Sequence, residues 1–140
     1  MNLLYSQRYV HDHVHDIPMD DNTFDVVICN HVLEHVNDSH KVMTEFFRVM
    51  KPGGWGIFQV PIDTNNLITL EDKSIIDPKQ RELLYWQDDH LRLFGLDYGK
   101  KLSAAGFKVT ESDFINELSP ELVQRYALPE GEIIYFCEKK

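Results

Sequence analysis

A short polar stretch directly after an apolar run carries the side chains best suited to chemistry in this sequence. Asn30, His31, Glu34 and His35 follow the apolar residues 26–29. An imidazole can take a proton from a hydroxyl or amine near neutral pH, so His31 and His35 are candidate general bases. Together with the Glu34 carboxylate, the same imidazoles are donors that transition metals bind. The stretch therefore predicts either proton transfer or metal binding.

The spacing of His31, Glu34 and His35 also matches H-x-x-E-H, the inverted zinc-peptidase motif. If the stretch were helical, the two histidines would lie on one face and could hold a zinc ion, with Glu34 as the base. The motif is short, and no later segment offers a recognisable third ligand. We therefore keep a zinc hydrolase as an alternative and predict no metal site.

A second polar group lies in residues 88–92. Asp88, Asp89 and His90 could form a hard-metal or substrate site, or a loop held by side-chain to backbone hydrogen bonds. His90 and Arg92 could contact an anionic substrate, although Arg92 could equally pair with a neighbouring acid.

The hydrophobic pattern predicts strands that alternate with helices. Residues 25–30 form an apolar run with a polar end, which suits a strand buried on both faces. Asp38 or Ser39 can cap a helix whose apolar positions recur at helical spacing up to Met50, and the turn 51–54 ends it. Further strands are expected over 8–14, 55–62 and 133–137 and near Phe107, and further helices are expected to start near Asp77, Asp97 and Ser119.

This alternation indicates a three-layer α/β fold with a mainly parallel sheet. A length of 140 residues is enough for one domain, so we expect a single domain over 1–140. Ligands of open α/β sheets bind beyond the carboxyl ends of the strands. Residues 30–35 lie just past such an end, which makes them the strongest candidates for a site.

Four stretches, in this order, resemble class I S-adenosylmethionine-dependent methyltransferases of type 11. They are DNTFDVVICNHVLEHV (21–36), EFFRVMKPGGW (45–55), HLRLFG (90–95) and AAGF (104–107). The first is similar to the family's fourth-strand region, and the second is similar to the helix and turn that follow it. The resemblance covers roughly residues 4–115.

The resemblance implies a Rossmann-like sheet with an antiparallel last strand and helices on both faces. It also implies S-adenosylmethionine as cofactor and a small-molecule methyl acceptor. The adenine would lie near Asp12, His13 and Val14, and the sulfonium and the acceptor would lie near Asn30 and His31. Methyl transfer mainly requires an acceptor that is held in line with the methyl group and kept dry.

The same resemblance assigns roles to the polar clusters. His31 and His35 would be catalytic bases, if the acceptor is a hydroxyl or an amine. Glu34, His90 and Arg92 would bind the acceptor.

The sequence departs from the family before the fourth strand. The family begins with a strand, a glycine-rich loop, a helix and a second strand that ends in a ribose-binding acid. None of these is recognisable here, and the chain starts near the end of the second strand, at Leu3 to Tyr5. Gly53 and Gly54 cannot replace the loop, because they follow a helix and precede a strand.

We therefore expect a truncated domain that binds S-adenosylmethionine very weakly by itself. Two hypotheses remain open. The chain is either part of an enzyme that is active in a longer protein or an assembly, or a non-catalytic remnant that serves as an interaction module.

The missing strands also predict an assembly. The family's sheet order is 3-2-1-4-5-7-6, so the contiguous part that remains is 4-5-7-6, and the strand over 25–30 becomes an edge. An apolar edge without proline or interior charge is a template for pairing with another chain. We expect a homodimer through this exposed edge.

Composition excludes other partners. The formal net charge of −9 repels phosphate backbones, so we expect no nucleic-acid partner. No apolar run is long enough to cross a bilayer and the N-terminus lacks signal-peptide features, so we expect no membrane partner and a cytoplasmic protein. Cys29 and Cys137 lie in apolar strand-like runs and are expected to be reduced.

Overall fold

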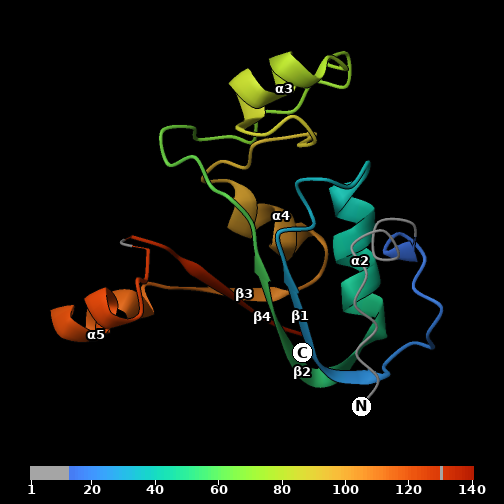
Figure 1. Ribbon diagram of the computed structural model, residues 1–140. Coiled ribbons are helices and arrows are strands. Elements are labelled where there is room, and N and C mark those ends of the chain that lie inside the picture. Colours follow the sequence, from blue (N-terminus) through green and yellow to red (C-terminus); the bar gives the residue numbers. More distant parts are fainter. Residues whose placement is uncertain (1–12, 130) are drawn as a thin grey trace.

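Four strands form one open sheet in the order β1-β2-β4-β3 (Figure 1). The structure is a computed structural model that describes residues 13–129 and 131–140. β1 and β2 are parallel, and β4 runs antiparallel to both β2 and β3. Three strands therefore share one direction and the last one opposes them, which confirms the predicted order and the α/β class. The strands are β1 (Phe24–Asn30), β2 (Met50–Gln59), β3 (Lys108–Ser112) and β4 (Ile134–Glu138).

The helices form where the capping residues predict them. The Asp38 side chain accepts a hydrogen bond from the Lys41 backbone N–H at 2.9 Å and begins α2. Asp77 caps α3 in the same way through Gln80, and Pro120 stands in the first turn of α5. The helices are α2 (Ser39–Val49), α3 (Pro78–Tyr85), α4 (Tyr98–Ala104) and α5 (Pro120–Arg125), with a 3-10 turn, η1, over Phe114–Glu117.

Three local expectations are wrong. β2 starts at Met50, so the residues expected to form a turn are already part of the strand. Asp97 does not cap α4; its carboxylate accepts hydrogen bonds from the backbone N–H and the hydroxyl of Thr69. The expected strand over 8–14 lies mostly outside the described residues, and residues 13 and 14 are helix and turn.

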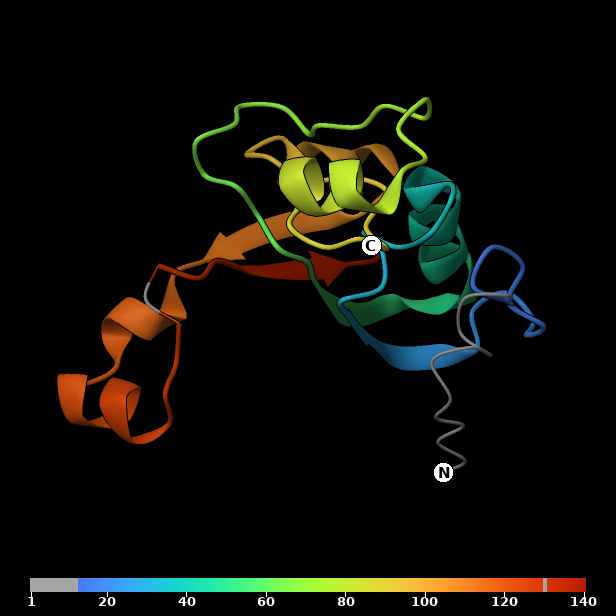
Figure 2. The same cartoon turned by 45° about the horizontal axis from the view of Figure 1, so that its top comes forward.

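The hydrophobic core lies on one face of the sheet. Phe58 of β2 and Cys137 of β4 point to this face, where they meet Met43 of α2 and Leu102 of α4, and all four are fully buried. Figure 2 shows α2 and α4 on the same side of the strands, and Figure 1 shows α3 above α4. Tyr98 adds a polar tie, since its buried hydroxyl donates to the Phe58 carbonyl at 2.8 Å.

The opposite face of β1 is open in the described part of the chain. Val26 and Ile28 are 39% and 62% exposed, although both are apolar. Beside them, the half-buried Trp55 and Phe136 stack at 5.4 Å between ring centroids. The prediction that β1 is buried on both faces is therefore wrong, because the described helices that build the core, α2 and α4, cover the other face.

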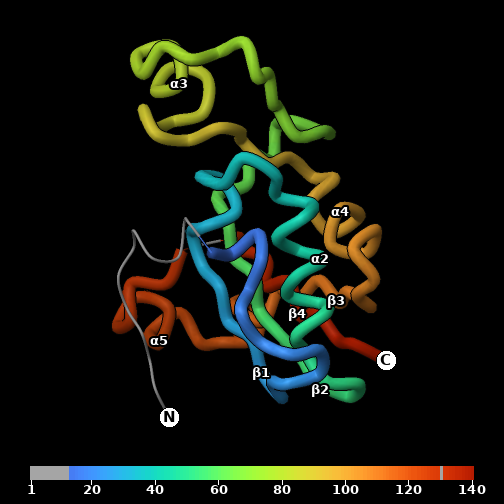
Figure 3. Tube along the Cα trace, turned by 90° about the vertical axis from the view of Figure 1, so that its right-hand side faces the viewer, coloured from blue at the N-terminus to red at the C-terminus, as the bar shows by residue number. Residues whose placement is uncertain are grey.

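The segment before β1 is fastened to α2 (Figure 3). Arg48 donates hydrogen bonds to the carbonyls of Ile17 and Met19, and Glu45 accepts one from the Ile17 N–H. The two side chains also pair with each other at 2.8 Å. This pairing holds the approach to β1 against the helix.

Both cysteines carry free thiols, as expected. Burial, and secondarily the negative charge of Glu34, raise the pKa of Cys29 to about 12. Burial alone raises the pKa of Cys137 to about 12. Among the described residues, no helix has the length and apolar character needed to cross a bilayer.

The one-sided core predicts a sharp contrast between two leucines. Leu102 is fully buried in α4, whereas Leu83 on α3 is 82% exposed. We expect Leu102→Ala to lower the free energy of unfolding by about 2–5 kcal/mol, because it leaves a cavity between the helix and the sheet. Leu83→Ala should change it by less than about 0.5 kcal/mol. Urea denaturation followed by circular dichroism measures both, and equal effects would contradict this description of the core.

Candidate active site beyond the carboxyl ends of β1 and β2

A cleft of about 340 Å³ opens where β1 and β2 end. Since parallel strands end at the same edge of a sheet, this is the position at which open α/β sheets bind ligands. The lining includes polar groups from both strand ends and apolar walls from later segments; His31, Gln59, Pro61, Ile62, Trp86 and Leu96 are among its residues.

His31 is the predicted site residue that lines the cleft. Its backbone N–H donates to the Gln59 carbonyl at 2.8 Å, so the chain stays paired with β2 for one residue beyond β1. Its backbone is left-handed, with φ of 56°, which costs about 1–2 kcal/mol for a residue with a side chain. The imidazole is 64% exposed, and its Nδ1 lies 3.4 Å from Glu34 Oε1. The imidazole ring is therefore accessible to a ligand in the cleft, and Glu34 orients it through Nδ1.

A tryptophan that the sequence analysis left without a role stands on the same cleft. Trp86 ends α3 with φ of 74° and is 52% exposed. Bulky residues with left-handed backbone are found disproportionately at functional sites. They persist there because the surrounding structure enforces the strained conformation. The sequence signal was weak: tryptophan after an amphipathic helix is no more than a large apolar residue.

Asn30 and Gln59 tie the strand ends together. The Asn30 side-chain oxygen accepts from the Gln59 backbone N–H at 3.4 Å. The Gln59 side chain then bridges to the start of β4, donating to the Ile133 carbonyl at 3.0 Å and accepting from the Tyr135 N–H at 3.2 Å. Asn30 therefore belongs to the frame of the cleft.

Glu34, His35 and His90 form a cluster beneath this cleft. Glu34 and His90 are each 1% exposed, and the His35 side chain is 14% exposed. His35 Nε2 lies 3.8 Å from Glu34 Oε1, and the two imidazole rings meet edge to face at 4.7 Å. The structure thus brings His90, assigned to acceptor binding, next to His35, assigned to catalysis, although 55 positions separate them in the sequence.

The zinc-peptidase arrangement is not formed. Residues 31–35 make a turn, not a helix, so His31 and His35 do not share a helical face. The residues that converge are instead Glu34, His35 and His90. The sequence motif paired the wrong histidines, because the helix that would align them does not exist.

Arg92 holds the turn that follows β1. Its Nη1 donates to the carbonyls of Leu33 and Val36 at 2.6 Å each, and its Nη2 donates to Glu71 at 2.9 Å. The side chain is 1% exposed. Of the two alternatives for this residue, pairing with a neighbouring acid is the one that the geometry favours, and neither Arg92 nor His90 lines the cleft.

Two of the residues expected near the adenine, His13 and Val14, lie outside the cleft. Asp12 is outside the described residues. His13 is exposed, and Val14 is 9% exposed and packs in the core. Neither lines the cleft at the strand ends.

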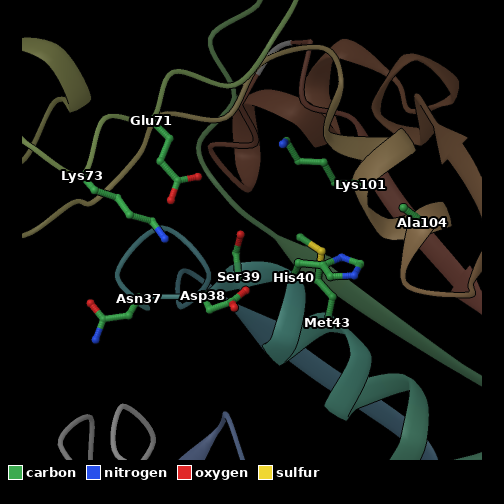
Figure 4. A pocket seen from close by; sticks show the side chains of 9 residues that line it. All are labelled: Asn37, Asp38, Ser39, His40, Met43, Glu71, Lys73, Lys101 and Ala104. Carbon is green, nitrogen blue, oxygen red and sulfur yellow. The ribbon is translucent and has the colours of Figure 1, made fainter.

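A larger hollow of about 560 Å³ lies between the start of α2 and α4 (Figure 4). Its side chains have mixed charge, with Lys73 and Lys101 facing Asp38 and Glu71. Its lining contains none of the residues at the carboxyl ends of β1 and β2, and the left-handed residues His31 and Trp86 stand on the other cleft. We therefore assign the site to the smaller cleft.

Part of the chain is similar in sequence to known methyltransferases. Residues 2–58 match the methyltransferase domain family. A stretch of 72 residues, 51% of the chain, is 39% identical to the ubiquinone/menaquinone biosynthesis C-methyltransferase UbiE of Pasteurella multocida. That match spans 23% of the relative, so the chain covers only about a quarter of its length.

Solved structures share the fold. The 1,6-didemethyltoxoflavin-N1-methyltransferase of Burkholderia thailandensis, solved with 1,6-didemethyltoxoflavin and S-adenosylhomocysteine, superposes with a TM-score of 0.55 at 13% identity. The superposition covers 91% of this chain and 48% of that one. The [4+2]-cyclase SpnF gives a TM-score of 0.58 at 17% identity, over 90% of this chain and 54% of that one.

Sheet order and these superpositions define a Rossmann-like α/β fold, which the chain shares with solved methyltransferases. In its N-terminal half the chain is similar to S-adenosylmethionine-dependent methyltransferases.

The Arg92 contacts generate a stability prediction. A lysine ammonium cannot span the carbonyls of Leu33 and Val36 and the Glu71 carboxylate at once, so Arg92→Lys leaves buried acceptors unpaired. We expect a loss of about 2–4 kcal/mol in unfolding free energy and faster amide exchange in residues 33–37. Arg125→Lys, at an exposed position of α5, is the matched control. If Arg92→Lys leaves the midpoint of denaturant unfolding unchanged, Arg92 does not stabilise the turn that follows β1.

Proposed function

We propose that this chain forms the acceptor side of a methyltransferase site that transfers a methyl group from S-adenosylmethionine to a small molecule. The observation that carries the proposal is the cleft at the ends of β1 and β2, with the exposed imidazole of His31 on its wall. The match of residues 2–58 to the methyltransferase domain family supports the reaction class, because the cofactor of such enzymes supplies an electrophilic methyl group on a sulfonium.

The chain's own residues fit the acceptor better than the cofactor. Trp86, Leu96 and Ile62 give apolar walls that suit a flat, ring-shaped molecule and keep it dry. His31 is placed to take a proton from a hydroxyl, an amine or a ring carbon of the acceptor. The quinone-biosynthesis C-methyltransferase among the relatives, and the small heterocycle bound in one fold neighbour, support an acceptor of this kind.

Cofactor binding by residues 1–140 alone should be weak. The sequence contains no glycine-rich loop between a strand and a helix, and no ribose-binding acid after it. Loss of two or three such hydrogen bonds, at about 1–3 kcal/mol each, weakens binding by at least about a hundredfold.

We expect calorimetric titration of this chain with S-adenosylmethionine to give no low-micromolar dissociation constant. At millimolar S-adenosylhomocysteine, amide chemical shifts should move at Asn30, His31 and Gln59, and not in residues 37–43. His31→Ala should reduce these shifts at the strand ends, whereas His40→Ala, on the hollow between α2 and α4, should not. Tight binding would overturn the weak-binding prediction, and shifts confined to residues 37–43 would overturn the proposed site.

We further propose that the chain assembles as a homodimer through β1 and the open face beside it. β1 stands at one edge of the described sheet, and Val26 and Ile28 present exposed apolar surface there. Such an edge pairs readily with a second copy. This assembly is also what the second hypothesis, a non-catalytic interaction module, requires.

A cytoplasmic, single-domain protein over 1–140 is consistent with its two free thiols and its one core cluster.

Light scattering at micromolar concentration should give twice the chain mass of 16.4 kDa. Ile28→Lys should shift the chain to a monomer, because it places a charge on the apolar edge. Leu83→Lys, at a position on α3 that is even more exposed, should leave the dimer intact. A wild-type monomer with slowly exchanging amides at residues 26–29 would contradict the proposal.

A further inference from the structure

Glu34 is a buried carboxylate whose nearest titratable neighbours are the imidazoles of His31, at 3.4 Å, and His35, at 3.8 Å. It is 1% exposed, and neither carboxylate oxygen accepts a hydrogen bond from any residue that the structure describes. A buried anion is costly unless a cation or several donors compensate it. Arg92, the nearest buried cation in sequence, directs its Nη atoms to backbone carbonyls and Glu71.

Two imidazoles face this carboxylate from different segments. His35 follows Glu34 in the turn after β1, and His90 comes from the loop after α3. One ligand-type atom from each of the three residues lies within 4.8 Å of the others. Zinc bonds to nitrogen and oxygen are about 2.0–2.2 Å, which places ligand atoms about 3.3 Å apart, so modest side-chain rotations would close the set.

The outer nitrogens of both rings contact oxygen acceptors. His90 Nδ1 lies 2.7 Å from the Tyr85 carbonyl, so it carries the proton and leaves the lone pair on Nε2. His35 Nδ1 lies 3.2 Å from an Asp89 carboxylate oxygen, close enough for an ion pair but without the alignment of a hydrogen bond, while its Nε2 faces Glu34. Metal-binding histidines almost always hold their second nitrogen against a carbonyl or carboxylate in this way, because it fixes the tautomer and the ring orientation.

We propose that Glu34, His35 and His90 bind a divalent transition metal of the zinc class, with a fourth position left open. Two imidazoles and one carboxylate are a donor set that zinc and its neighbours accept. The ion would neutralise Glu34 and join the turn after β1 to the loop before Arg92. This site is separate from the methyl-transfer cleft: its three residues do not line that cleft, although Glu34 also approaches His31.

Zinc binding to the chelator-treated 140-residue chain tests the proposal without cofactor or acceptor. Calorimetry with zinc chloride should give one ion per chain, and Co²⁺ should develop the visible absorption of a four-coordinate site. Glu34→Gln keeps the side-chain shape and removes the charge, so it should stay folded and weaken zinc binding by at least about a hundredfold. His90→Gln should do the same, and Asp89→Asn should weaken it about tenfold.

Two matched histidine variants separate this site from its alternatives. His40→Ala, on α2, and His31→Ala should each leave the zinc affinity within about threefold of the wild type. A loss in His31→Ala that equals the loss in His90→Gln would assign the metal to the H-x-x-E-H pair instead. Unchanged binding in Glu34→Gln, or no zinc bound to the wild type, would overturn the proposal. Since no methyl transfer is measured, none of these outcomes depends on the proposed function.

Discussion

One buried cation, the guanidinium of Arg92, joins the turn that follows β1 to the loop that carries His90. It binds backbone carbonyls of the turn 33–37, which directly follows β1, and it pairs with Glu71. A guanidinium does not lose its proton in a protein, so this charge must be satisfied wherever it is buried. The path of the chain out of β1 follows from that requirement. The left-handed backbone of His31 and the inward direction of Glu34 are parts of the same path.

The sheet is asymmetric, and this asymmetry separates two roles. Its covered face, packed against α2 and α4, supplies the rigidity that holds the strand ends and their cleft in place. Its open face around Val26 and Ile28 exposes apolar surface in the described chain. Small α/β domains bury only a modest fraction of their surface on folding. Association that covers an exposed apolar face of the sheet therefore adds substantially to their stability. Chemistry and assembly can therefore occupy different parts of one small domain.

Much of the fold was predictable because its signals are local. The Asp38 cap and the apolar spacing of α2 placed that helix correctly, and the apolar run with a polar end placed β1. The family resemblance then gave the strand order. Prediction failed where a side chain suited to a local hydrogen bond binds a residue far away in the sequence instead. Asp97 had the residue type and position of a cap, but Thr69 offers its carboxylate two hydrogen bonds.

The sequence by itself determined which elements form, and that His31 follows a strand end, because capping and hydrophobic periodicity act within a few residues. Only the tertiary structure decided that Glu34 and His35 meet His90, and that Arg92 is a clamp. It also decided that, among the described residues, none covers the second face of β1 around Val26 and Ile28 completely. Contacts across more than fifty residues depend on the path of the whole chain, and burial depends on what packs against a surface; neither quantity is carried by the spacing of neighbouring side chains.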